Sequence, residues 1–128
     1  MRKNTDLALL ILRVVFSVAM LTHGWGKISK VFQGDFAFAD PIGIGAELTL
    51  VITAIGEFIA PILIIVGYQT RWAAALTTLV MLGAMIAVHM ANGDAFDRWE
   101  KALLFFTGFL AIALAGGGKY SLTFKRKF

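Results

Sequence analysis

The chain alternates between long apolar runs and short polar connections, and this pattern predicts four helices. The apolar runs cover residues 7–21, 48–66, 72–88 and 99–115. A helix rises ~1.5 Å per residue, so ~20 apolar residues cross the ~30 Å hydrocarbon core of a bilayer. With their flanking residues, we expect four transmembrane helices at about 7–29, 47–67, 71–90 and 98–116. The predicted fold class is all-α: a single integral membrane domain, residues 1–128, built as a four-helix bundle.

The connections between the runs are short, apart from one segment and the C-terminal end. Residues 31–45 interleave phenylalanines with Asp, Gly and Pro, which predicts a non-helical segment at the membrane surface. That segment is compatible with a lid over a site and with a simple amphipathic connector. Three glycines, 116–118, end the fourth helix, because each costs roughly 1 kcal/mol relative to alanine inside a helix. Residues 119–128 follow as a basic tail.

Composition supports a membrane protein and removes several classes of site. Hydrophobic residues make up 59% of the chain and charged residues 16%, which is too little polar surface for a water-soluble domain of this size. Cysteine is absent, and this excludes disulfides and thiolate metal sites. The net charge of +4 is explained by basic residues beside a bilayer surface. We therefore expect membrane lipids as partners and no nucleic acid.

The basic residues outside the apolar runs are distributed unevenly, which predicts the orientation. The side that holds both termini carries seven: Arg2, Lys3, Arg71, Lys119, Lys125, Arg126 and Lys127. The opposite side carries four: Lys27, Lys30, Arg98 and Lys101. Lys and Arg are enriched in the cytoplasmic loops of membrane proteins. We therefore expect an N-in/C-in arrangement with both termini in the cytoplasm.

Two ionisable residues lie inside the predicted spans. A charge at the bilayer centre costs ~2.5–3.5 kcal/mol on insertion scales and usually faces a partner within the bundle. Arg13 lies about two turns into the first span and Glu57 near the midpoint of the second, at depths that we expect to differ by only a few ångströms. The sequence therefore predicts a buried Arg13–Glu57 ion pair, either as a structural clamp or as the floor of a functional site.

A second set of polar side chains lies towards the outer ends of the spans. His23 and Lys27, in the run HGWGK, are four residues apart and share one face of the first helix. His89 lies near the outer end of the third span, and Glu100 lies near the outer end of the fourth. We expect His23, Lys27, His89 and Glu100 to line one outer pocket that binds a substrate, with no catalytic residue assigned.

The chemistry of these groups suits a quinone, because imidazole and ammonium groups donate hydrogen bonds to carbonyls and exchange protons. The two histidines are also compatible with axial ligation of haem or, together with Glu100, with a divalent metal. Their spacing matches no ligand motif, so we expect no metal and no covalent cofactor. A further interpretation makes both histidines interfacial residues that hydrogen-bond to the backbone or to lipid headgroups.

Several motifs share one order along the chain: LRVVFSVAMLTHGWGKI, then IGEFIAPILIIVGYQTR with Glu57, then VHMANG and finally Glu100. The order and spacing resemble the DoxX family of small bacterial membrane proteins, from about Leu7 to Ser121. The matching positions are Arg13, His23, Gly24, Lys27, Glu57, Gly67, Thr70, Arg71, His89, Gly93 and Glu100. Members of that family are four-helix membrane proteins linked to quinone-dependent oxidoreduction, including subunits related to thiosulfate:quinone oxidoreductase.

The resemblance implies a quinone-interacting subunit, or an accessory component, of an oxidoreductase system in the bacterial inner membrane. Two other functions are compatible with the sequence. The basic tail and Arg71 suit an adaptor that recruits a soluble partner, and Glu57 suits a small-molecule or proton transporter. Gly83 and Ala87 have a small-xxx-small spacing that would serve a homo-oligomer or packing within one bundle. The chain contains no flavin, nicotinamide or phosphate-binding fingerprint, so we do not expect it to be an enzyme on its own.

Overall fold

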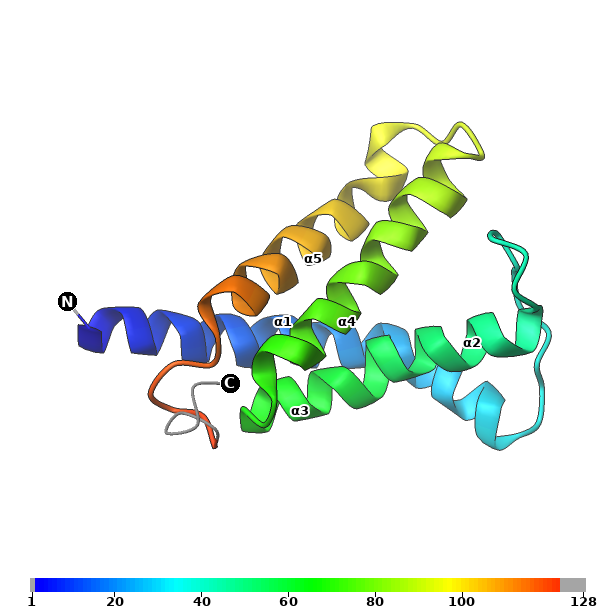
Figure 1. The fold of residues 1–128 in the computed structure, drawn as a ribbon. Helices are drawn as coiled ribbons and strands as arrows, with labels where there is room; N and C mark the ends of the chain where they lie inside the picture. The colour runs from blue at the N-terminus through cyan, green and yellow to red at the C-terminus, as the bar shows by residue number, and fades with distance from the viewer. Residues whose placement is uncertain (1, 123–128) are drawn as a thin grey trace.

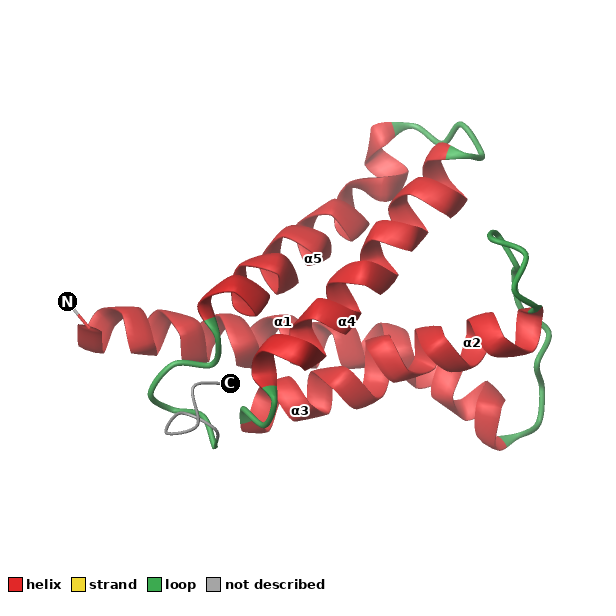
Figure 2. Cartoon of the chain, in the orientation of Figure 1, coloured by secondary structure: helices red, strands yellow, loops and turns green. Residues whose placement is uncertain are grey.

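The chain folds into four helical runs joined by short loops (Figure 1). The computed structural model describes residues 2–122, so the basic side chains at 125–127 lie outside the described residues. The runs are α1 (Arg2–Phe32), then α2 (Ala46–Ala54) with η1 (Ile55–Ile59) and α3 (Ala60–Val66), then α4 (Thr70–Gly83) with η2 (Ala84–Met90), and finally α5 (Phe96–Ala115). No strand occurs among residues 2–122 (Figure 2). The all-α class and the four helices are confirmed, although α1 begins earlier than predicted.

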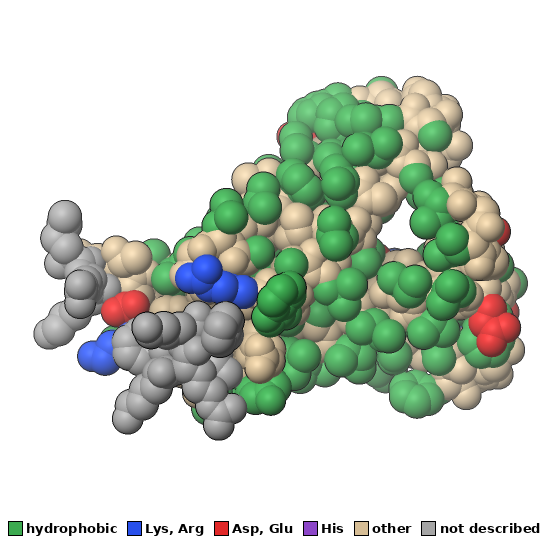
Figure 3. All heavy atoms as spheres, in the orientation of Figure 1, with side chains coloured by type: hydrophobic (Ala, Val, Ile, Leu, Met, Phe, Trp, Pro, Cys, Tyr) green, Lys and Arg blue, Asp and Glu red, His purple; other side chains and the backbone are tan. Residues whose placement is uncertain are grey.

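Three of the runs are long and apolar enough to cross a membrane: Asn4–Phe32, Ala46–Val66 and Thr70–Met90. The fourth, α5, has 20 residues, but positions 97, 98, 100 and 101 are charged, so its crossing and the cytoplasmic location of the termini stay predictions. Large apolar side chains are exposed on the outside of the bundle, among them Val15, Leu79 and Leu114 at 57%, 64% and 71%. On the face drawn in Figure 3, charged side chains gather at the ends and the band between them is apolar. Such a surface suits lipid as its solvent.

The four runs form two antiparallel pairs. α1 packs along α2, η1 and α3, while α4 packs along α5. The pairs meet through α3 with α4 and α1 with α5. The buried core consists of Met20, Ala60, Ile64, Ala73, Ala74, Met81, Phe109 and Ile112. In Figure 1, α4 and α5 cross the other pair and then diverge from α2 towards their connecting loop. We call the diverging parts of the two pairs, α4–η2–α5 and α1–α2, the two arms. Figure 3 shows a hollow between the two arms.

The two ends of the bundle are built differently, and we call them the loop half and the termini half. The loop half ends at the loops 33–45 and 91–95, where the two pairs diverge. The termini half ends at the turn 67–69 and at the segment 116–122, where the pairs are in contact.

In the loop half, residues 33–45 are held by polar contacts of their own. The backbone N–H of Asp35 donates to the Lys30 carbonyl at 2.9 Å, and Lys30 Nζ donates to Asp35 Oδ2 at 3.0 Å. Asp40 accepts hydrogen bonds from the backbone N–H of Gly45 at 3.0 Å and from Thr49 Oγ1 at 3.3 Å. Asp40 therefore ties both the residue before α2 and the first turn of that helix to the loop.

In the termini half, the C-terminal segment packs directly onto the end of α3. Gly67 ends α3 with φ of 79°, a left-handed conformation that favours glycine. A Cβ at Gly67 would lie 2.6 Å from Ser121 Cα, so a larger residue would push the segment away. The backbone N–H of Lys119 donates to Asp6 Oδ1 at 3.0 Å. The segment therefore ties the start of α1 to the end of α3.

Candidate functional site

The best-defined ionic contact inside the bundle joins Lys27 of α1 to Glu57 of η1. Lys27 Nζ lies 2.7 Å from Glu57 Oε1, and the exposed fractions of the two side chains are 26% and 5%. Lys27 Nζ is also 3.5 Å from the His23 carbonyl one turn earlier. A buried carboxylate is costly unless a cation or hydrogen-bond donors face it. Lys27 meets that need while keeping part of its own side chain accessible.

The local structure of η1 places Glu57 at this contact. Pro61 has no N–H to donate to the Glu57 carbonyl four residues earlier, and the backbone N–H of Ala60 donates to the Ile55 carbonyl, five residues back. This π-helical ring widens the helix around Glu57. Isolated π-helical segments inside α-helices are frequent at functional sites.

Two close contacts hold η1 against its neighbours. Gly24 of α1 lies against the Glu57 carbonyl, so closely that a Cβ at position 24 would overlap it. On the opposite side, Thr77 Oγ1 of α4 donates to the Gly56 carbonyl at 2.7 Å, in a part of the helix where the α-helical bonding pattern is interrupted. The Lys27–Glu57 distance is therefore set by backbone contacts and not by side-chain packing alone.

His23 lies at the edge of the same site and connects it to α5. Its ring meets the Phe105 ring edge-on, with centroids 5.5 Å apart and planes at 78°. Electrostatic interactions join His23 to Lys27, Glu57 and Lys101. Lys101 is exposed and lies one turn before Phe105 on α5. The site thus consists of one carboxylate, two ammonium groups and one imidazole from three of the four runs.

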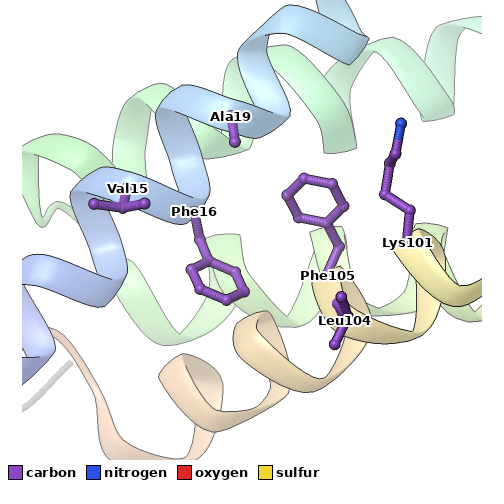
Figure 4. A pocket seen from close by; sticks show the side chains of 6 residues that line it. All are labelled: Val15, Phe16, Ala19, Lys101, Leu104 and Phe105. Atoms are coloured by element: carbon purple, nitrogen blue, oxygen red, sulfur yellow. The ribbon is translucent and has the colours of Figure 1, made fainter.

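An apolar floor of aromatic rings lies on the inner side of His23. Phe105 and Phe109 stack with centroids 6.2 Å apart, and Phe16 meets each of them edge-on at 6.1 Å. A Cβ at Gly108 would overlap the Phe16 ring, so glycine there lets α1 and α5 approach. Figure 4 shows Phe16 and Phe105 side by side between these helices, with Lys101 beyond Phe105.

Two residues that we predicted for this pocket have other surroundings. His89 Nδ1 lies 2.9 Å from Asp94 Oδ2, in the loop that follows η2. η2 packs against α4 and α5, on the arm that diverges from α1 and α2 (Figure 1). Glu100 is exposed in the first turns of α5. Among residues 2–122, no described contact joins His89 or Glu100 to His23 or Lys27, so of the predicted four the structure brings together His23 and Lys27.

The predicted Arg13–Glu57 ion pair is replaced by two separate interactions. Arg13 is fully buried. Its Nη1 donates to the Ile64 and Ile65 carbonyls at 2.9 and 3.0 Å, and its Nη2 donates to the Tyr120 carbonyl at 2.6 Å. The carbonyls at a helix C-terminus carry the negative end of the helix dipole, so the end of α3 provides the counter-charge.

Arg13 and Glu57 do not meet because of the register between α1 and the second helical run. Gly24 lies against Glu57, and Arg13 comes eleven residues before Gly24 on an antiparallel helix. Eleven residues span about 16 Å of helix. Arg13 therefore reaches the end of α3, and α1 extends beyond that end (Figure 1). Counting depth from the start of the first span placed Arg13 too close to the membrane centre.

Lys101 is a site residue that the sequence pattern did not lead us to predict. It shares a helix face with Phe105 and Ile112, which come four and eleven residues later and which face the interior. That spacing was a usable signal. Glu100 was expected instead because it lies near the outer end of the fourth span, but its side chain lies about 100° around the helix from that of Lys101. Among residues 2–122, no group of three or more His, Asp or Glu side chains is arranged to hold a metal ion.

The chain is similar to one protein family and to several known bacterial proteins. The family described as DoxX matches residues 8–90, a range that includes Lys27 and Glu57. An Escherichia coli (strain K12) protein named "Inner membrane protein YqjF" is 32% identical over 125 residues, which are 95% of this chain and 94% of that protein. A Bacillus subtilis (strain 168) protein named "Putative oxidoreductase CatD" is 32% identical over 116 residues, 91% of this chain and 84% of that protein. No solved structure matches the chain.

Proposed function

This chain belongs to the DoxX family, and on that premise we propose that it is a quinone-interacting subunit or accessory component of a membrane oxidoreductase system. The quinone head binds beside the Lys27–Glu57 pair, with His23 and Lys101 next to it. The bacterial inner membrane, named for the E. coli relative, is the proposed location, with both termini in the cytoplasm. The name of the B. subtilis relative supports the link to oxidoreduction.

The observation that carries the proposal is the Lys27–Glu57 ion pair, in which Glu57 is buried near the middle of its span and the Lys27 side chain is partly accessible. Glu57 lies eleven residues after the start of the 21-residue run Ala46–Val66, near its midpoint. A charge kept at such a depth marks a functional site by default. The Lys27 ammonium has three N–H donors; one is given to Glu57 Oε1 at 2.7 Å and a second, at 3.5 Å, to the His23 carbonyl. The third donor, on the partly accessible side chain, is therefore available for the carbonyl oxygen of a lipid-soluble ligand.

The site residues suit proton exchange, and the electrons come from elsewhere. Reduction of a quinone to a quinol takes up two electrons and two protons, and amino-acid side chains of these types carry protons and not electrons. Glu57 and His23 are groups that release and take up a proton. The electron donor is another redox component of the same membrane system. Because this chain handles the protons and another component supplies the electrons, the chain would act as a subunit or accessory component.

The test is whether quinone stays bound through purification and depends on the pair. Wild-type protein, purified in detergent and extracted with organic solvent, is expected to yield near-stoichiometric quinone by mass spectrometry. The variants Lys27→Gln and Glu57→Gln are expected to lose it while keeping the helical circular dichroism of the wild type. Lys30→Gln is the matched control, because Lys30 is on the same helix but pairs with Asp35 in the loop. If a quinone analogue shows no saturable binding to folded wild-type protein, the proposal is wrong.

A further inference from the structure

An apolar groove runs between α1 and α5 and ends near His23 and Lys101. Its volume is about 230 Å³, and its lining consists of Val15, Phe16, Ala19, Lys101, Leu104 and Phe105. All of these side chains are apolar apart from Lys101, which lies at one end of the groove (Figure 4). An apolar cavity of about 150 Å³ is enough for a benzene-sized molecule. This groove is therefore large enough for a branched hydrocarbon segment.

The groove opens sideways, towards the surroundings of the bundle. Val15 and Leu104 form its rim, and their side chains are 57% and 60% exposed. Phe16 and Phe105 form the floor and are partly buried in the core. In a membrane-spanning bundle, a groove with this rim faces the hydrocarbon chains. A lipid-soluble molecule can enter it laterally without crossing water.

One end of the groove leads to the polar groups. Ala19 comes one turn before His23 on α1, and Phe105, which lines the groove, also contacts the His23 ring. Lys101 both lines the groove and interacts electrostatically with His23. A ligand lying along the groove would therefore have its hydrocarbon part against Phe16 and its polar end near His23 and Lys101.

The groove is continuous with the proposed site, and this distinguishes between two kinds of occupant. Its polar end lies beside His23 and Lys101, and His23 adjoins the Lys27–Glu57 pair. The proposed function places an uncharged quinone head at that pair, and the isoprenoid chain of a quinone is attached directly to its head. The position of the groove therefore favours this chain over the acyl chain of a separate phospholipid.

From these contacts we infer that the α1–α5 groove holds the first part of the isoprenoid chain of the quinone, and that Lys101 is a further contact for its head. This inference rests on the proposed function. It adds a prediction about ligand specificity: the protein discriminates quinones by their chain, because part of the binding free energy comes from apolar area buried in the groove.

The experiment compares two ligands that share one head. One carries an isoprenoid chain and the other carries only a methyl group in its place. Wild-type protein in detergent is expected to bind the chain-bearing quinone at least tenfold more tightly, as measured by quenching of tryptophan fluorescence. Ala19→Trp, which fills the groove, is expected to remove that tenfold difference and to leave the affinity for the methyl compound unchanged. Ala8→Trp is the control, since Ala8 is exposed on the same helix and does not line the groove.

The outcomes separate the two proposals. If wild-type protein binds neither compound, the proposed function fails and the inference fails with it. If it binds both equally, or if Ala19→Trp weakens both equally, quinone binding stands and the groove has no part in it. If Ala19→Trp instead releases a co-purified phospholipid and leaves both quinone affinities unchanged, the groove holds an acyl chain and the inference is wrong. Should Ala19→Trp fail to fold, Leu104→Trp at the exposed rim replaces it in the same comparison.

Discussion

The termini half and the loop half both contain a cation inside the bundle, but they surround it differently. Arg13 is fully buried and donates to three main-chain carbonyls. Lys27 is 26% exposed and faces a carboxylate. Main-chain carbonyls neither take up a proton nor change their charge, so the surroundings of Arg13 are fixed. A carboxylate does both, and part of the Lys27 side chain stays accessible. The comparison separates a cation that holds the fold together from one that is available for chemistry.

The largest expected effect is the loss of stability when Arg13 is replaced. Arg13→Met leaves three carbonyls without their donor, and an unsatisfied buried polar group costs ~1–3 kcal/mol. We expect the free energy of unfolding to fall by about 3 kcal/mol or more. The double variant Lys27→Met/Glu57→Met is expected to stay within about 1 kcal/mol of the wild type, because replacing both members of a buried pair is often neutral. Denaturant unfolding in detergent measures the free energy of unfolding of both variants. If both lose the same amount of stability, the two halves do not differ in the way described.

A second contrast uses two glycines that are two residues apart on α1. A Cβ at Gly24 would overlap the Glu57 carbonyl, whereas a Cβ at Gly26 has no neighbour within 4 Å. Gly24→Ala is expected to lower the free energy of unfolding by about 2 kcal/mol, as overpacking typically does. Gly26→Ala is expected to raise it by up to ~1 kcal/mol through helix propensity. The same unfolding measurement applies, and a stable Gly24→Ala would mean that α1 and η1 are not in backbone contact.

A third contrast tests whether the site includes one histidine or two. His23 interacts with Lys27 and Glu57, while His89 interacts with Asp94. His23→Gln is expected to weaken binding of a quinone analogue about tenfold, which corresponds to ~1.4 kcal/mol, and His89→Gln is expected to leave it unchanged. Titration of tryptophan fluorescence measures both affinities. A matching loss in His89→Gln would show that the two arms close around the ligand and would restore the pocket expected from the sequence.

The smallest expected effect concerns the ion pair in the loop 33–45. The hydrogen bond from Lys30 holds the pKa of Asp35 below its ordinary value. A depressed carboxyl pKa adds stability above the ordinary pKa and loses it as the pH falls, but Asp35 is exposed to solvent, where such a contribution is screened. Lys30→Gln is therefore expected to raise the Asp35 pKa towards its ordinary value without a measurable change in stability. NMR titration of the Asp35 carboxyl group in detergent checks the direction, and an unchanged pKa would show that the pair is absent in solution.

The helices were predictable from the sequence because apolar runs of spanning length determine them locally. The pairing of charges was not, because it depends on how far antiparallel helices slide past each other. Gly24 carries that information, since only glycine fits against the Glu57 carbonyl, but nothing in the sequence identifies its partner. Pro61 hinted at an irregular helix near Glu57. Its missing N–H does not by itself specify that the Ala60 N–H bonds to the carbonyl five residues back, so the π-helical ring was not predictable.

The candidate site was predictable in part. His23 and Lys27 share a helix face that the spacing of four residues identifies, and they lie in one place. Whether His89 joins them depends on the angle between two helix pairs, which no local pattern encodes. Lys101 could have been predicted, because it lies four residues before Phe105 and so shares a helix face with it.

The contact between Arg13 and Tyr120 also constrains how the protein is made. The two residues are 107 positions apart, and a ribosome adding ~5–20 residues per second needs on the order of ten seconds to produce that stretch. During this interval the Arg13 guanidinium lacks one of its final acceptors. The burial of Arg13 is therefore completed only after Tyr120 has been delivered. A chain stopped before Tyr120 should be recognised by membrane quality-control proteases as unfinished, and a pulse-chase comparison with the whole chain would measure its shorter lifetime.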